Sequence, residues 1–181
     1  MQVADLAGVQ PLEIIFTAGG SEANNLAFKG VAHKRRHLVV SAVEHPSVRK
    51  TAEWMRSLGY RVDFFDVDRG GQIDLEQVRS LVTEETAMVS CMLANNETGH
   101  IYPVRELGQI AHAKGALMHT DAVQALGKIE FNFRELNVDL ATLSGHKFYA
   151  LKGSGVLYAR KGVMVNPLIH GGMQERGRRA G

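Results

Sequence analysis

The chain has 181 residues, of which 45% are hydrophobic and 22% are charged, so it can form one domain with a sizeable core but hardly two. Its formal net charge of +2 comes without a basic stripe of the kind that binds nucleic acid, and no uncharged apolar stretch could span a bilayer. The single cysteine, Cys91, excludes an internal disulfide and, with a start that is not signal-like, favours a reducing, cytoplasmic location.

Strand-like and helix-like segments alternate along the chain. We expect the end of a helix at 1–9, strands at 13–17, 38–42, 61–67, 87–94, 117–121, 140–144 and 155–158, and helices at 21–32, 46–58, 74–82 and 104–114. Ser21 is a plausible N-cap for the first of these full helices. Near-continuous apolar strands between amphipathic helices predict an α/β fold with a mostly parallel sheet flanked by helices on both faces.

Polar residues follow five of the predicted strands. They occupy 17–21, 44–45, 95–97, 121 and 144–147. Ligands of open α/β sheets bind beyond the carboxyl ends of the strands. We therefore expect these residues to converge on one site.

An amine, an acid and a glycine loop are the chemically informative parts of this set. Lys147 could form a Schiff base if partial burial and nearby positive charge depress its pKa, and Asp121 could pair with a protonated ring nitrogen. The loop at 19–21 could hold a phosphate at a helix start, and Gln124 could reach a ring hydroxyl. Together these parts suit pyridoxal 5'-phosphate. Taken singly, they could instead be a surface lysine, an N-cap for a helix at 122–126, a tight turn and a polar helix residue.

Two further residues have competing interpretations. His45 could stack on the cofactor ring and move protons, or could simply cap the following helix. Asn96 could bind cofactor or substrate, or belong to an ordinary turn. A metal hydrolase using His45, His119 and Asp121 is a further alternative, although no compact metal-binding motif is present, so we expect no metal.

Taken together, these stretches resemble the cysteine desulfurases of the class V aminotransferase group. The resemblance rests on residues 15–25, 43–45, 95–99, 119–124, 144–147, 170–172 and 174–181. It implies the large domain of an aspartate-aminotransferase-like fold and a reaction that takes sulfur from L-cysteine, leaving L-alanine and a persulfide. It also implies a homodimer and a sulfur-acceptor or iron–sulfur scaffold protein as partner.

The resemblance also implies residue roles. Lys147 would carry the cofactor, Asp121 would pair with its pyridine nitrogen and Gln124 with its ring oxygen. His45 would stack on the ring and act as acid and base, and Asn96 would lie beside cofactor and substrate. The phosphate would be held by Gly20, Ser21, Ser144 and His146.

Family members also have an N-terminal segment and a smaller C-terminal domain, which carries the attacking cysteine and a carboxylate-binding arginine. We therefore expect residues 1–181 to be one cofactor-binding domain, truncated at both ends, in which the reaction is incomplete. Cys91 lies in an apolar run and should be buried rather than act as sulfur acceptor. The alternatives are a selenocysteine lyase or another class V lyase or transaminase, and a non-catalytic domain that binds cofactor or a partner.

Overall fold

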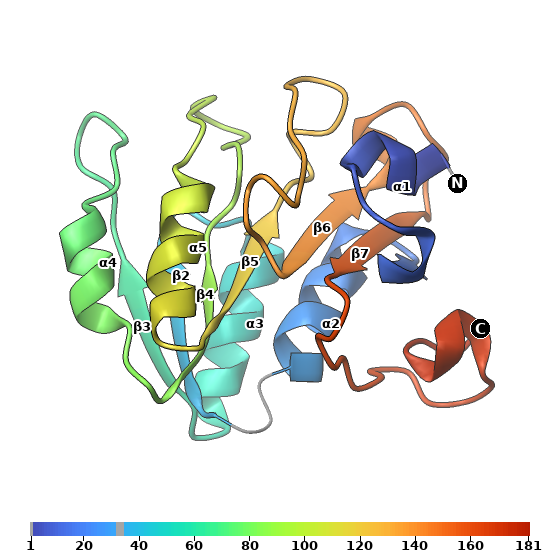
Figure 1. The fold of residues 1–181 in the computed structure, drawn as a ribbon, viewed down its shortest axis with the longest axis horizontal. Coiled ribbons are helices and arrows are strands. Elements are labelled where there is room, and N and C mark those ends of the chain that lie inside the picture. The colour runs from blue at the N-terminus through green and yellow to red at the C-terminus, as the bar shows by residue number, and fades with distance from the viewer. Residues whose placement is uncertain (1, 32–34) are drawn as a thin grey trace.

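The computed structural model describes residues 2–31 and 35–181, which form a seven-stranded sheet in the order β1-β7-β6-β5-β4-β2-β3 (Figure 1). The strands are β1 (Ile14–Thr17), β2 (His37–Ser41), β3 (Arg61–Phe65), β4 (Thr86–Ser90), β5 (Leu117–Asp121), β6 (Leu140–Ser144) and β7 (Gly155–Ala159). β3, β2, β4, β5 and β6 pair in parallel, and only β7 runs antiparallel to its neighbours β1 and β6. The predicted α/β fold with a mostly parallel sheet is confirmed.

Helices cover both faces of this sheet, with α2 and α3 on one side and α4 and α5 on the other (Figure 1). The helices are α1 (Gln2–Ala7), α2 (Gly20–Val31), α3 (Pro46–Ser57), α4 (Leu75–Leu81) and α5 (Val104–Ala113), with short 3-10 turns η1 (Pro11–Glu13), η2 (Gly145–Lys147) and η3 (Gln174–Gly177). None of the helices in the described ranges has the length and apolarity that crossing a bilayer requires.

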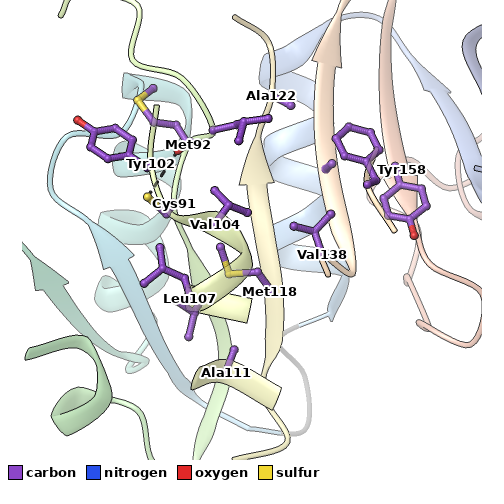
Figure 2. Packing of buried hydrophobic residues seen from close by; sticks show 14 of the residues in the cluster. Cys91, Met92, Tyr102, Val104, Leu107, Ala111, Met118, Ala122, Val138 and Tyr158 are labelled. Carbon is purple, nitrogen blue, oxygen red and sulfur yellow. Dashed lines mark hydrogen bonds between the residues drawn. The ribbon is translucent and has the colours of Figure 1, made fainter. Parts of the chain in front are cut away.

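Each face of the sheet has its own hydrophobic core. On the α4 and α5 side, Leu107 and Met118 pack between helix and sheet, as Figure 2 shows. On the other side, Phe28 and Leu26 of α2 pack against the sheet. All four side chains are fully buried, and each such burial stabilises the fold by about 1.5–3 kcal/mol. Two complete cores make the sheet a rigid platform for residues at its edge.

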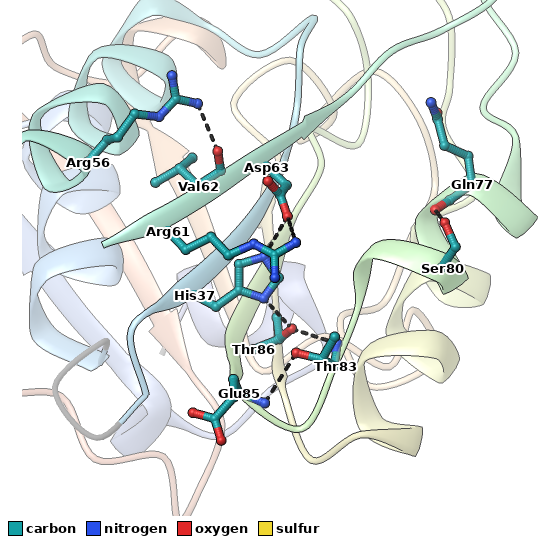
Figure 3. Close-up of polar contacts among 10 residues, drawn as sticks. All are labelled: His37, Arg56, Arg61, Val62, Asp63, Gln77, Ser80, Thr83, Glu85 and Thr86. Atoms are coloured by element: carbon teal, nitrogen blue, oxygen red, sulfur yellow. Dashed lines mark hydrogen bonds and ion pairs between the residues drawn. The ribbon is translucent and has the colours of Figure 1, made fainter. Parts of the chain in front are cut away.

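The amino ends of three neighbouring strands are joined by one histidine (Figure 3). His37 Nε2 lies 3.1 Å from Asp63 Oδ2, and His37 Nδ1 lies 2.8 Å from Thr86 Oγ1. Arg61 completes the group with an ion pair to Asp63 at 2.6 Å. Burial, with Arg61 nearby, lowers the pKa of His37, and the contact with Asp63 opposes this in part. This network fixes β2, β3 and β4 at the edge opposite the predicted site.

Three local predictions differ from the structure. Ser21 is not an N-cap, because α2 begins at Gly20 and Ala23 N–H donates to Gly19 O. Residues 122–126 form a turn rather than a helix, although Asp121 Oδ1 still accepts from Val123 N–H. β4 ends at Ser90 instead of reaching 94, although Cys91 N–H and Leu93 N–H still donate to the β5 carbonyls of His119 and Asp121. Ala32, the expected last residue of the first full helix, lies outside the described residues.

Candidate functional site

The carboxyl ends of five strands surround a cavity of about 510 Å³, a size ordinary for small-molecule sites. β1, β2, β4, β5 and β6 lead into its lining. All nine predicted site residues line it: Gly20, Ser21, His45, Asn96, Asp121, Gln124, Ser144, His146 and Lys147. The structure therefore brings together the full set that the sequence predicted.

Asp121 supplies a buried carboxyl group to the cavity. It ends β5 and is only 5% exposed. Asn24 Nδ2 donates to its Oδ2 at 2.9 Å, and Val123 N–H donates to its Oδ1 at 3.0 Å. Burial raises the pKa of Asp121, while these two donors and the nearby His45 oppose that rise. The environment thus orients both oxygens as acceptors and suits a cationic N–H donor.

Another part of the lining is made of glycines, hydroxyls and a helix start. α2 begins at Gly20, so its free N–H groups and dipole favour an anion there. A Cβ on Gly20 would lie 3.2 Å from both Ser144 Cβ and Val123 Cγ2, so a larger residue would crowd the wall. The Ser144 hydroxyl lies 3.0 Å from His146 Nδ1. This donor set matches a phosphate group.

His45 caps α3 and also lines the cavity. Ser47 N–H donates to its Nδ1 at 3.1 Å, and the Ser47 hydroxyl lies 2.8 Å from the same nitrogen. Because Nδ1 accepts from the backbone, the neutral ring carries its proton on Nε2. The cap interpretation and the cavity interpretation of His45 are therefore compatible, since each uses a different nitrogen.

Lys147 lies in the turn η2, directly after β6, and lines the cavity. The residue is exposed, so the partial burial that would favour a neutral amine is not found. Gln124 is half-buried, and its Oε1 accepts a hydrogen bond from Lys128. Asn96 is exposed in a loop that Asn95 holds by accepting N–H bonds two and three residues on.

Asn24 also lines the cavity and had no predicted role. Asn24 lies on the buried face of α2 and donates to both Asp121 and the Ser47 hydroxyl. One residue thus connects the carboxyl of β5 to the histidine cap of α3. The available signal was a polar residue at a core position of an amphipathic helix, since Ala23 and Ala27 are buried beside it.

The metal-site alternative has no geometric support. His119 is fully buried and does not line the cavity that holds His45 and Asp121. Its two ring nitrogens face the hydroxyls of Ser90 and Thr142. Over residues 2–31 and 35–181, no three metal-ligating side chains form a cluster.

Cys91 is fully buried, as expected from its apolar surroundings. Burial raises the pKa of its thiol well above the usual value, and the nearby Glu44 adds to this effect. A sulfur acceptor needs an accessible thiolate. Cys91 therefore does not supply one.

Cysteine desulfurases and NifS-like proteins are similar to the chain in sequence and in fold. Residues 1–177 match the family model of class-V aminotransferases. The cysteine desulfurase IscS of Methanosarcina thermophila is 44% identical over 99% of the chain, which spans 46% of that relative's length. A solved NifS-like protein, 44% identical, superposes with a TM-score of 0.95 over 99% of the chain and 51% of its own. A structure titled SspA in complex with cysteine, 38% identical, superposes at 0.94 over 99% and 53%.

The chain therefore spans about half the length of the relatives it matches. Nearly its whole length matches one family model, and its fold matches solved members closely. The chain belongs to the class-V aminotransferase family.

Proposed function

We propose that residues 1–181 are the pyridoxal 5'-phosphate-binding large domain of a cysteine desulfurase. One observation carries the proposal: an amine, a buried acceptor carboxyl and a helix start with hydroxyls all line one cavity. These groups fit the three ends of the cofactor, its aldehyde, ring nitrogen and phosphate. When bound, the cofactor supplies an electron sink for bonds at the amino-acid α-carbon.

The residues of the chain would bind and orient that group. Lys147 Nζ would hold its aldehyde carbon, and the Asp121 carboxylate would accept from its ring N–H and keep the proton there. Gln124 would bond the ring oxygen, which requires it to give up its contact with Lys128. The phosphate would be held by Gly20, Ser21, Ser144 and His146.

His45 and Asn96 would act on the substrate side of the cavity. His45 Nε2 would hold or move a proton, since Nδ1 is fixed by Ser47. Asn96, exposed in its loop, would donate to cofactor or substrate. L-cysteine as substrate is supported by the desulfurase relatives and by SspA, which was solved with cysteine.

The proposed whole protein is a cytoplasmic homodimer that passes persulfide sulfur to an acceptor or iron–sulfur scaffold protein. Cys91 is too buried to attack substrate sulfur. The attacking thiol would therefore come from outside these residues, and the chain alone would bind the cofactor without completing the reaction.

Reconstitution with pyridoxal 5'-phosphate tests the cofactor site. We expect a yellow absorption band, and borohydride should fix the added mass on the peptide that contains Lys147. K147A should lose both signals. K152A, which changes an exposed lysine outside the cavity lining, should keep them. A band that survives K147A, or none in the unaltered chain, would contradict the proposal.

A non-catalytic cofactor-binding role is the second candidate for the chain by itself, and the burial of Cys91 favours it. Sulfide release from L-cysteine by the loaded chain separates the two. We expect no release above a cofactor-only blank, and steady turnover would show that these residues complete the reaction.

A further inference from the structure

A chain of buried polar groups crosses four neighbouring strands beside the cavity. Glu44, just after β2, has its Oε1 3.2 Å from Ser90 Oγ at the end of β4. Ser90 Oγ lies 2.9 Å from His119 Nδ1 in β5, and His119 Nε2 lies 3.3 Å from Thr142 Oγ1 in β6. All four residues are at most 5% exposed. None of them has a role in the proposed chemistry.

The number of hydrogens available limits which of these polar groups can donate and which can accept. The Ser90 hydroxyl has one hydrogen, so it donates either to Glu44 or to His119. If it donates to His119 Nδ1, then Glu44 must be protonated to donate to Ser90, and His119 carries its own proton on Nε2. If it donates to Glu44, then His119 must carry its proton on Nδ1 and Glu44 can be ionised.

Two observations favour the protonated form of Glu44. Its second oxygen, Oε2, is buried and accepts no well-formed hydrogen bond from the described residues, although the Met92 backbone lies close enough to the carboxyl to oppose the rise of its pKa in part. A buried carboxylate with one such poorly satisfied oxygen is costly. Asp121, the neighbouring buried acid, has two donors on its oxygens. The negative charge is therefore better placed on Asp121 than on Glu44.

We propose that Glu44 is a positioning residue that stays protonated and donates to Ser90, so that Asp121 and not Glu44 carries the negative charge of this buried pair of acids. The step from this charge placement to cofactor binding rests on the proposed function, because Asp121 is there the acceptor for the ring N–H. The proton order itself does not depend on any cofactor.

The titratable neighbours of Glu44 agree with this charge placement. Burial raises the pKa of Glu44 well above its usual range, and Asp121 raises it further, while Ser90 and the Met92 backbone oppose this in part. Burial lowers the pKa of His119 to about 3, so its ring is neutral. The other titratable groups that sense Glu44 are the un-ionised side chains Cys91 and Tyr102, whose pKa values are raised.

Nuclear magnetic resonance of the cofactor-free chain tests the proton order directly. The Glu44 carboxyl carbon should keep the chemical shift of a protonated acid from about pH 4 to pH 7, and the His119 nitrogens should report a proton on Nε2. A Glu44 that titrates near the ordinary glutamate range, or a His119 proton on Nδ1, would overturn the proposal. Neither readout involves pyridoxal 5'-phosphate, so failure here is distinct from failure of the cofactor site.

Two substitutions extend the test to the loaded protein. In E44Q the amide can still donate to Ser90, so His119 should keep its proton on Nε2. The Kd for pyridoxal 5'-phosphate should change less than about twofold. In E44L the donor is lost, so the tautomer populations should shift and the Kd should rise about tenfold. An E44Q variant that binds as weakly as E44L would show that Glu44 acts as a charge, and the proposal would fall.

Discussion

Single side chains decide what the cavity can hold, and Asp121 is the clearest case. It is fixed by one side-chain donor, Asn24, and one backbone donor, Val123. Both bonds point hydrogen toward the carboxyl oxygens, so the group can only accept. The N-cap role that the sequence left open survives as the bond to Val123 N–H, although no helix follows. The bond to Val123 N–H and the proposed role as cofactor partner are thus compatible uses of one carboxylate.

Replacing Asp121 by asparagine tests its role as acceptor. The asparagine NH2 group would face either Asn24 Nδ2 or Val123 N–H, both of which are donors, so one hydrogen bond would be lost. The substitution would also remove the negative charge. We expect the Kd for pyridoxal 5'-phosphate to rise by about 10- to 100-fold, the scale of a lost charge-assisted hydrogen bond. D66N, the same change at an exposed position, is the control and should leave the Kd unchanged. If D121N and D66N bind pyridoxal 5'-phosphate equally well, Asp121 is not an acceptor for the cofactor.

At the scale of elements, the cavity depends on how closely β7 approaches the β1–α2 loop. A Cβ on Gly155, the first residue of β7, would lie 2.4 Å from the carbonyl carbon of Gly19 and 2.5 Å from its Cα. Only a glycine allows this contact, because both partners are backbone. The antiparallel strand β7 thereby supports the loop that leads into Gly20 and the start of α2.

The variant G155A should therefore force β7 and the loop apart. We expect the free energy of unfolding, measured by urea denaturation, to fall by about 1–3 kcal/mol, as for other overpacked sites. The matched control is G19A, on the other side of the same contact, where an added Cβ meets nothing within 4 Å and φ is not positive. G19A should be nearly as stable as the unaltered chain. Similar losses in both variants would mean that the contact does not limit packing.

At the scale of the whole molecule, the sequence predicted the sheet and the cavity lining well. Parallel strands buried on both faces leave continuous apolar runs, and the polar residues after those runs meet at one edge. What it could not predict depends on burial and on tertiary contacts. The exposure of Lys147 depends on how η2 projects, and the link from Asn24 to Asp121 joins elements far apart in the chain. The hydrogen-bonded chain through Ser90 and His119 likewise appears only when four strands are aligned.

The stability of the whole chain should depend on pH through His119. Its pKa falls from 6.5 to about 3 on folding because of burial, so between these values the unfolded state binds a proton that the folded state does not. The free energy of unfolding should therefore rise with pH in this window, by up to about 1.4 kcal/mol per pH unit from this residue.

Glu44 and Asp121 act in the opposite direction, because their raised pKa values make the folded state keep protons above the ordinary carboxyl range. The net slope of the unaltered chain is therefore smaller than His119 alone would give, and the variant H119Q isolates the histidine term. Between roughly pH 4 and pH 6, H119Q should lower the slope of the unfolding free energy against pH by about 1.4 kcal/mol per pH unit, which is the contribution of one proton. H170Q, which changes an exposed histidine, is the control. An unchanged slope in H119Q would show that His119 binds its proton equally in both states, which its complete burial between Ser90 and Thr142 makes costly.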